Sequence, residues 1–314
     1  MTFQQVHSAE WLAHFVRIGH PAARPLAAGV EGAVYDLGDG TVAKVWGRRR
    51  PAELRPWQEF YADLAAGDLP FGTPEILRVD DVGGVAVTVE RLLPGTPLQV
   101  DPEAVELPRA VTRTMVDVLR ALATVPATAA MRRLPVLDES GPFRTAGDDF
   151  PAALTALLHR RTARSGPLLR RHVPDFDRRH TALLAGLAAL ARRPDTVLHG
   201  DLFGDNVLVD SGGRPAAVLD FGFLSGAGDP RFDAAVTAAT MNMYGPHAAA
   251  ITETLTDTVA ADLGHDPAVL RLYRAAYAVA TSDAFAADGS DGHFAWSVRQ
   301  LTAPGTTAAL GLSG

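Results

Sequence analysis

The sequence predicts an α+β protein with a small β-rich N-terminal part, residues 1–93, and a larger, mainly helical part, residues 94–314. Short apolar runs separated by glycine-rich turns fill the first part, whereas helix-start signals dominate the second. The Leu93–Pro97 segment, with two prolines and a glycine, interrupts both patterns and is the best candidate linker. A chain of 314 residues is also long for one simple core, so two domains are expected.

Four strands and one helix are expected in the N-terminal part. Val30–Leu37 and Thr41–Trp46 flank a Gly-Asp-Gly turn, which indicates a hairpin. Pro51–Ala66 has apolar residues three or four positions apart, which is typical of a helix. Two further strands are expected near Pro74–Val79 and Val85–Leu92.

Three Asp-Pro pairs predict helix starts in the second part, because Asp caps a helix N-terminus and Pro fits its first position. They are Asp101-Pro102, Asp229-Pro230 and Asp266-Pro267. Another helix is expected from Pro174-Asp175 to about Arg193, and residues 126–148 are expected to form a long irregular connection. Three short strands should interrupt the helices, at Val197–Leu198, Val207–Val209 and Ala216–Leu219.

Composition excludes several classes of protein. The chain has no cysteine, which rules out disulfides, thiolate chemistry and cysteine-bound zinc. A net charge of −7 argues against a nucleic-acid partner. No apolar run is long enough for a membrane span, and the N-terminus shows no secretory signal, so a cytoplasmic location is expected.

Two residue types are rare enough to draw attention. Lys44 is the single lysine beside 28 arginines, and Asn206 and Asn242 are the only asparagines. An ammonium group and a guanidinium group are not interchangeable. Lys44 is therefore a candidate for a position where only lysine fits, although chance survival of a rare residue explains it equally well on its own.

The segment from Leu198 to Val209 carries the chemistry. His199, Asp201 and Asn206 lie in a loop between two strand-like runs, and Asp220 ends the next apolar run. Carboxylate and amide oxygens suit magnesium, a further carboxylate can accept a hydroxyl proton, and a lysine can neutralise phosphates. Together these residue types indicate phosphoryl transfer.

These motifs resemble the aminoglycoside phosphotransferase family, the small-molecule branch of the protein-kinase-like fold. The His-Gly-Asp motif that begins at His199 has Asn206 five residues after its Asp, and Asp-Phe-Gly begins at Asp220. The resemblance implies that Asp201 is the catalytic base. It also implies that Asn206 and Asp220 bind Mg2+ and that His199 braces the loop.

The resemblance extends upstream to the nucleotide site. Lys44, in Val-Ala-Lys-Val, is similar to the lysine that contacts the α- and β-phosphates of ATP. Its helix partner is then Glu59 or Glu53, with Glu59 preferred. The Gly29–Val34 segment would cover the phosphates, although it has only two glycines.

Further family features are expected around this core. Gly29 and Gly32 are the glycines of the phosphate-covering loop, and the backbone near Glu90 and Leu92 would hold adenine. Downstream, Gly-Asp-Pro-Arg-Phe-Asp ends at Asp233, which supports the catalytic loop in the family. Only 13 positions separate it from Asp220, and the long activation segment of protein kinases is missing, so the resemblance implies a small-molecule acceptor.

The acceptor itself stays open at this stage. An aminoglycoside or related antibiotic, with a role in resistance, is one hypothesis. The alternatives are a choline, homoserine or sugar kinase, and an ATP-binding protein without catalytic activity. Residues 126–150 and Thr281–Trp296 are expected to form the acceptor pocket, with Phe294 and Trp296 more often core residues than pocket lining. Seven acidic residues there would suit a polycation: Asp138, Glu139, Asp148, Asp149, Asp283, Asp288 and Asp291.

Overall fold

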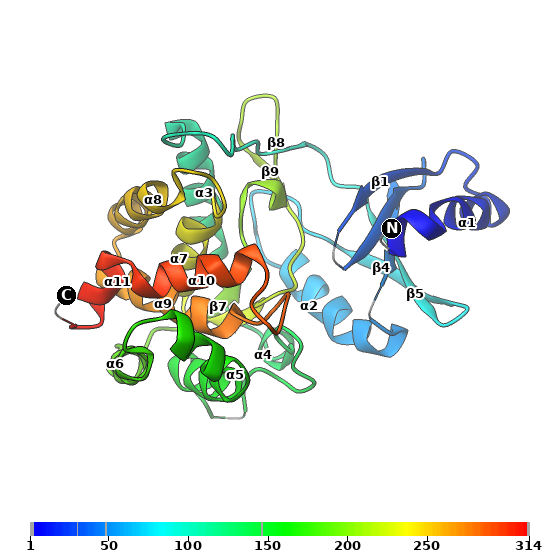
Figure 1. The fold of residues 1–314 in the computed structure, drawn as a ribbon. Helices are drawn as coiled ribbons and strands as arrows, with labels where there is room; N and C mark the ends of the chain where they lie inside the picture. Colours follow the sequence, from blue (N-terminus) through cyan, green and yellow to red (C-terminus); the bar gives the residue numbers. More distant parts are fainter. Residues whose placement is uncertain (1–2, 30, 48, 146, 313–314) are drawn as a thin grey trace. The chain divides into compact units, whose positions relative to one another are not determined.

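The structure, a computed structural model, describes residues 3–29, 31–47, 49–145 and 147–312 and divides into two compact units. Unit 1 comprises Met1–Gly95 together with Ala216–Leu219, and unit 2 comprises Thr96–Pro215 and Asp220–Gly314. Figure 1 draws the first 95 residues in blue to cyan and follows the rest of the chain to red at the C-terminus. Among the described helices, none is both long and apolar enough to cross a membrane.

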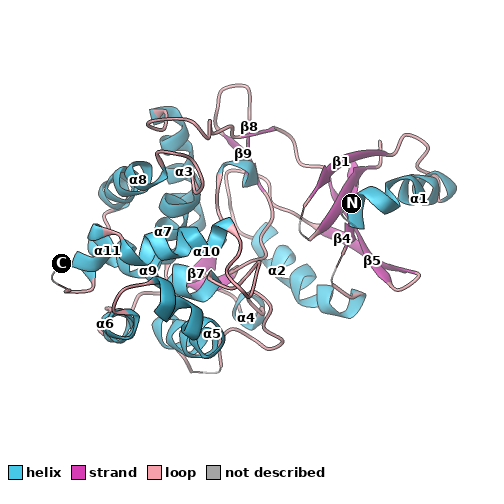
Figure 2. Cartoon of the chain, viewed as in Figure 1, coloured by secondary structure: helices cyan, strands magenta, loops and turns pink. Residues whose placement is uncertain are grey.

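Unit 1 is built on a five-stranded antiparallel sheet with the order β1-β2-β3-β5-β4. Figure 2 shows these strands in magenta. The hairpin of β2 and β3 was expected from the sequence, and β4 and β5 were expected as two further strands. The strands are β1 (Arg24–Ala28), β2 (Gly32–Asp36), β3 (Thr41–Trp46), β4 (Ile76–Val82) and β5 (Val85–Arg91).

The two faces of this sheet differ, because successive side chains of a strand point to opposite sides. One face packs against helix α1 (Phe3–Arg17) through a core that includes Phe15, Tyr35, Val45 and Val87. The ring centroids of Phe15 and Tyr35 lie 5.1 Å apart. The residues of β3 and β5 that alternate with these core residues therefore face the other side of the sheet. They include the polar residues Lys44 and Thr88.

The segment expected as one helix over Pro51–Ala66 forms two. A 3₁₀ helix η1 (Pro51–Leu54) leads directly into α2 (Arg55–Ala65), with a proline at the start of each. The buried face of α2 carries Trp57, Phe60, Tyr61 and Leu64. Helix α1 and strand β1 were not predicted, and Val30, the first residue of the expected hairpin, lies outside the described residues.

Unit 2 is mainly helical, and α9 is its buried centre. Every residue of α9 from Leu272 to Thr281 is buried, and α5, α7, α8, α10 and α11 all pack against it. Alanines at many of these positions let the helices approach closely. The helices are α3 (Arg109–Leu122), α4 (Ala129–Arg133), α5 (Phe150–His172), α6 (Phe176–Ala188), α7 (Pro230–Thr240), α8 (Ala248–Leu263), α9 (Pro267–Thr281), α10 (Gly292–Thr302) and α11 (Pro304–Ala309).

Short strands interrupt these helices, as the sequence predicted. Strand β7 (Thr196–Leu198) pairs antiparallel with β10 (Gly226–Gly228), and β6 (Thr96–Pro97) pairs antiparallel with β8 (Val207–Val209). The chain then turns through Ser211–Gly213 into β9 (Pro215–Val218). These strands lie just before and after the loop that carries the predicted catalytic residues.

Two of the three predicted helix starts are confirmed. Asp229 and Asp266 cap α7 and α9 by accepting the backbone N–H groups of Arg231 and Ala268. The start at Asp101-Pro102 is wrong. The Asp101 carboxylate accepts the N–H of Glu103 in an isolated turn, and the next helix begins only at Arg109.

Two other boundaries also differ from the predictions. The helix expected from Pro174-Asp175 begins at Phe176, close to the expected start, but ends at Ala188 and not at Arg193. The connection over residues 126–148 is not wholly irregular, because it contains the short helix α4, which Thr128 caps.

Candidate active site

A buried carboxylate holds the loop that follows β7. Asp233, on α7, accepts the backbone N–H of His199 at 2.6 Å and that of Gly200 at 2.8 Å. Asp233 is only 3% exposed, and this burial raises its pKa to about 6, against the lowering effect of the two backbone hydrogen bonds. The carboxylate therefore fixes the backbone of the His-Gly-Asp motif from a rigid helix.

Gly200 is required at its position for two reasons. Its φ of +74° lies in the left-handed region, which disfavours residues with a side chain. A Cβ there would also lie 2.2 Å from the backbone carbon of Leu224. The Ser225 hydroxyl donates to the carbonyl oxygen of His199 from the same neighbouring segment. The tight packing of these two segments explains why the motif has glycine between its His and its Asp.

Asp201 is oriented by partners on both its backbone and its side chain. Its N–H donates to Nδ1 of His199 at 3.3 Å, and its carbonyl oxygen accepts from Nδ2 of Asn206 at 3.0 Å. The Tyr277 hydroxyl donates to Oδ1 of Asp201 at 3.4 Å. Thus Asp201, Asn206 and His199, which the sequence analysis grouped, lie together in unit 2, and Tyr277 of α9 joins them.

The Asp-Phe-Gly segment is attached to the same loop by its aromatic ring. The centroids of Phe221 and His199 lie 4.4 Å apart, and both side chains are buried. Asp220 is exposed and has a φ of +52°, a conformation that Asp tolerates better than most residues. Asp220 is thus exposed, whereas the ring of the next residue, Phe221, is buried.

The donor atoms in this loop fit a hard cation such as magnesium. Because Nδ2 of Asn206 is held by the Asp201 carbonyl, the amide oxygen Oδ1 lies on the opposite side of that amide group. With the exposed carboxylate of Asp220, this gives one amide oxygen and one carboxylate, both of the type that magnesium accepts. Such a small protein donor set suits an ion that also binds phosphate oxygens and water.

In unit 1, Lys44 on β3 lies against a carboxylate and an aromatic ring. Its Nζ donates to Oε2 of Glu31 at 2.9 Å and lies 4.1 Å from the ring centroid of Trp46. Arg49 binds the other oxygen of Glu31 at 3.2 Å. Burial alone would raise the pKa of Glu31, but Lys44 and Arg49 together hold it below its ordinary value.

The two carboxylates considered as helix partners of Lys44 both take part in local contacts. Glu59 forms an ion pair with Arg55 at 3.5 Å on the outer side of α2, with 47% of its side chain exposed. Glu53 accepts the backbone N–H of Arg50 at 2.8 Å and so caps the start of η1. The Glu31 partner of Lys44 was not predicted, because Glu31 lies in the glycine loop and not on a helix.

The glycine loop and the predicted hinge are both held by backbone contacts. Gly29 donates its N–H to the carbonyl of Gly32 at 2.9 Å, and a Cβ on Gly32 would lie 2.0 Å from the carbonyl oxygen of Val45. Gly32 is thus needed for close approach to β3. At the hinge, the N–H of Leu92 donates to the carbonyl of Gly40 at 3.0 Å. In the glycine loop, Val30, which follows Gly29, lies outside the described residues.

A chain of side-chain hydrogen bonds runs across the same sheet face to Glu90. Trp46 Nε1 donates to the Thr88 hydroxyl at 3.1 Å, and this hydroxyl donates to Oε1 of Glu90 at 2.6 Å. Lys44 pairs directly with Thr88 between β3 and β5, which puts their side chains on one face. Lys44, Thr88 and Glu90 therefore line a common polar strip of unit 1.

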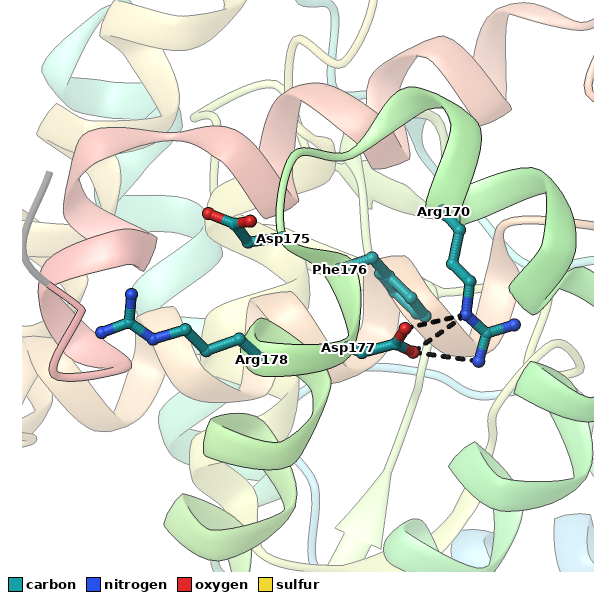
Figure 3. Close-up of a pocket in the computed structure, with 5 residues that line it drawn as sticks. All are labelled: Arg170, Asp175, Phe176, Asp177 and Arg178. Carbon is teal, nitrogen blue, oxygen red and sulfur yellow. Dashed lines mark hydrogen bonds and ion pairs between the residues drawn. The ribbon is translucent and has the colours of Figure 1, made fainter.

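A hollow of about 340 Å³ opens elsewhere in unit 2, where α5 leads into α6. Figure 3 shows two of its lining residues, Arg170 and Asp177, pointing toward each other, with Arg178 extending away from this pair. Nε of Arg170 lies 2.9 and 3.0 Å from the two oxygens of Asp177. Of the described residues that line it, none belongs to the predicted site. Arg170 and Asp177 already neutralise each other there, so the hollow offers no substitute for the Asp201 loop.

The five-stranded antiparallel sheet, the mainly helical part after it and the loops at Asp201 and Asp220 define a kinase-like fold. Residues 22–279 match the APH family, described as the phosphotransferase enzyme family. The chain belongs to this family, and the fold class predicted from the sequence is confirmed. No curated protein sequence matches the chain.

Solved structures of phosphotransferases share the fold at low sequence identity. Macrolide 2'-phosphotransferase MphH from Brachybacterium faecium is 21% identical, with 94% of this chain and 98% of that chain covered and a TM-score of 0.59. Aminoglycoside phosphotransferase APH(3'')-Id from Streptomyces rimosus is 20% identical, with 89% and 99% covered and a TM-score of 0.57. The kanamycin and GDP complex of APH(2")-IIIa is 15% identical, with 95% and 97% covered and a TM-score of 0.63.

Proposed function

We propose that this chain transfers the γ-phosphoryl group of ATP to a hydroxyl group of a small molecule, with Asp201 as the catalytic base. The observation that carries the proposal is the loop built around Asp201. Asp233 fixes the two residues before it, and Asn206 and Tyr277 bind Asp201 itself. A chain that needed Asp201 only as a turn residue would not require a buried carboxylate to brace its neighbours.

In this reaction the Asp201 carboxylate accepts or orients the proton of the acceptor hydroxyl. The hydroxyl oxygen forms a bond to the γ-phosphorus as the bond from that phosphorus to the bridging oxygen breaks, and ADP leaves. No covalent intermediate with the protein is required. Tyr277 orients the base by donating to one of its oxygens.

Asn206 and Asp220 would hold magnesium, which neutralises phosphate charge when it is bound. In unit 1, Lys44 would bind the α- and β-phosphates, with Glu59 as its helix partner and Gly29 and Gly32 in the covering loop. Glu31 holds Lys44 in the present structure, so nucleotide phosphates would compete with it for the ammonium group. The Leu92 N–H already donates to the carbonyl of Gly40. We therefore propose that adenine donates its hydrogen bonds to backbone carbonyl groups near Glu90 and Leu92.

Residues 1–93 would thus serve the nucleotide, and residues 94–314 the metal, the base and the acceptor. Related structures contain GDP or ADP, so both ATP and GTP deserve testing as donors. Related proteins are named for macrolides and aminoglycosides, which makes an antibiotic acceptor, and hence resistance, the first hypothesis. A metabolite kinase of choline, homoserine or sugar type is the alternative.

Thermal unfolding with magnesium and each nucleotide tests the proposal before any acceptor is known. A ligand that binds only the folded protein raises its melting temperature in proportion to the logarithm of its concentration. We expect this shift with magnesium-ATP or magnesium-GTP, followed by phosphorylation of an acceptor from a panel of antibiotics and metabolites. A shift without phosphoryl transfer to any acceptor would favour an ATP-binding protein without catalytic activity, and no shift at millimolar nucleotide would oppose both.

A further inference from the structure

An exposed aromatic surface lies close to Asp201 in unit 2. It consists of Tyr244, which is 61% exposed, Phe285, which is 54% exposed, and Phe223, which is half-buried. The rings of Phe223 and Phe285 are stacked, with centroids 5.9 Å apart and planes 10° from parallel. Scattered single apolar residues are ordinary on a surface, but grouped large rings mark a place where a ligand is bound.

Short contacts connect this surface to the proposed base. The Tyr277 hydroxyl donates to Asp201, and the ring of Tyr277 lies 6.4 Å from that of Phe223. Tyr244 lies within electrostatic range of the same carboxylate. Partial burial raises its pKa, and the charges of Asp291 and Asp201 raise it further. An acceptor resting on these rings would therefore have its hydroxyl groups near Asp201.

Buried residues hold the exposed rings in place. Nδ1 of His293 lies 3.3 Å from the Tyr244 hydroxyl, and Nε2 lies 2.8 Å from the hydroxyl of Thr281. The His293 ring also meets Phe285 edge to face, at 5.1 Å and 75°. Burial lowers the pKa of His293 to about 4, so it is neutral at pH 7 and can accept one of these hydrogen bonds while it donates the other. The surface is thus preorganised, which reduces the entropy lost on binding.

Four of the seven acidic residues that the sequence offered for a polycation are paired with arginines. Arg161 is 1% exposed at its side chain and binds both Asp138 and Asp283, and Arg164 binds the same two carboxylates. Arg160 pairs with Glu139, and Arg192 pairs with Asp149. The other three bond to local groups: Asp148 to Thr145, Asp288 to Ser290 and Asp291 to the N–H of Phe294.

To reach the carboxylates that are paired with arginines, a polycationic acceptor would have to displace those arginines. Breaking a buried pair such as Arg161 with Asp283 leaves an uncompensated charge, which is costly. An acceptor with an apolar face meets no such obstacle, because it displaces only water from the exposed rings.

We propose that Phe223, Tyr244 and Phe285 bind the acceptor, and that this acceptor is a hydroxyl-bearing molecule with an apolar face and at most one positive charge. This inference rests on the proposed phosphotransferase function. It deepens that function by naming the chemical class of the acceptor, and it sets aside the polycationic aminoglycosides.

The test compares matched acceptors with magnesium-ATP. Erythromycin and 4-nitrophenyl glucoside carry hydroxyl groups on a molecule with an apolar face, glucose lacks the apolar face, and kanamycin is a polycation. ATP consumption and acceptor mass are measured for wild type, Phe285→Ser and Tyr244→Ser. Val105→Ser is the control, because Val105 is 69% exposed but is not part of the aromatic surface. Binding to each variant is measured in parallel by calorimetry.

The expected result is phosphorylation or binding of an apolar acceptor, with a preference of about tenfold or more over both glucose and kanamycin. Phe285→Ser and Tyr244→Ser should each raise the acceptor KM about tenfold and leave the KM for ATP unchanged, and Val105→Ser should match wild type. Kanamycin used as well as the apolar acceptors, or a Phe285→Ser enzyme equal to wild type, would overturn the inference while leaving the phosphotransferase function intact. Failure of both apolar acceptors to bind or react would also overturn it. Loss of the nucleotide-dependent thermal shift would instead count against the function itself.

Discussion

The hydroxyl of Tyr277 donates to Oδ1 of Asp201 from the buried part of α9, in unit 2. Tyr277 is 1% exposed and is enclosed by the rings of Phe223, Phe232 and Trp296. Because the helix and the enclosing rings restrict the movement of Tyr277, its hydroxyl holds the Asp201 carboxylate in one orientation. Tyr277 is a positioning residue in the proposed reaction, since it acts through the base.

Removal of this hydroxyl should slow catalysis more than it weakens substrate binding. We expect Tyr277→Phe to lower kcat about tenfold, to leave the KM for ATP unchanged and to cost about 1 kcal/mol of stability. Tyr273→Phe is the matched control, because Tyr273 lies one turn earlier on α9 and donates to Asp229 at 2.8 Å. It should lose stability with little loss of kcat. Equal kcat losses in the two variants would show that Tyr277 is only structural.

The close approach of Gly200 to the backbone of Leu224 predicts that adding one methyl group at Gly200 strongly lowers activity and stability. Gly200→Ala should abolish most activity and lower the unfolding free energy by roughly 3 kcal/mol, since its Cβ would overlap the backbone of Leu224. Gly213→Ala is the control that distinguishes the effect of this overlap from the effect of backbone strain. Gly213 has a φ of +77°, close to the +74° of Gly200, but has open space around its Cβ position, and it should cost only about 1 kcal/mol. Urea denaturation of both variants measures the difference, and equal losses would contradict the packing argument.

The lone lysine should not tolerate replacement by arginine. The side chain of Lys44 is 13% exposed and fits between the Glu31 carboxylate and the Trp46 ring, where a forked guanidinium does not fit in the same way. We expect Lys44→Arg to lower kcat/KM for ATP about 100-fold. Arg49→Lys, which alters the second cation on Glu31, should retain most activity. Activity of Lys44→Arg near the wild-type value would refute the special role of this lysine.

The raised pKa of Asp233 predicts a pH dependence of stability with a definite sign. In the folded protein its pKa is about 6, against an ordinary value of 3.8, because burial disfavours the charged form. Between these values the folded protein holds the proton more tightly than the unfolded chain does. The stability contributed by Asp233 is therefore complete below about pH 4 and falls as the pH rises to about 6.

Unfolding free energies of wild type and Asp233→Asn, measured by urea at several pH values, isolate this contribution. The difference, wild type minus variant, should decrease from about pH 4 to about pH 6 and stay level above it. A difference that grows with pH over this interval would contradict the assigned pKa direction.

Much of the fold could be predicted from the sequence because its signals are local. The β2–β3 hairpin of unit 1, the helix starts at Asp229 and Asp266 and the strands around the Asp201 loop all follow from short patterns. The Asp101-Pro102 start failed because the same pair also stabilises an isolated turn. Helix α1 was missed because the N-terminal part was interpreted as β-rich throughout.

The contacts that could not be predicted join residues far apart in the sequence. Tyr277 is 76 positions from Asp201, and Asp283 is 122 positions from Arg161, so only the packing of α5 and α9 reveals these pairs. The sequence showed Asp283 among the acidic residues near Thr281–Trp296 but not the two arginines that pair with it, Arg161 and Arg164. Glu31 was likewise hidden, because a carboxylate in a glycine loop has no helical spacing to mark it as a lysine partner.

Phosphoryl transfer by wild type and by Asp201→Asn tests the central claim most directly. The substitution keeps the shape of the side chain and removes its ability to accept a proton. With magnesium-ATP and the best acceptor of the panel, wild type should add one phosphoryl group to that acceptor, measured by mass spectrometry. Asp201→Asn, still folded and still stabilised by nucleotide, should be at least about 100-fold slower. Equal rates for the two proteins would contradict the account.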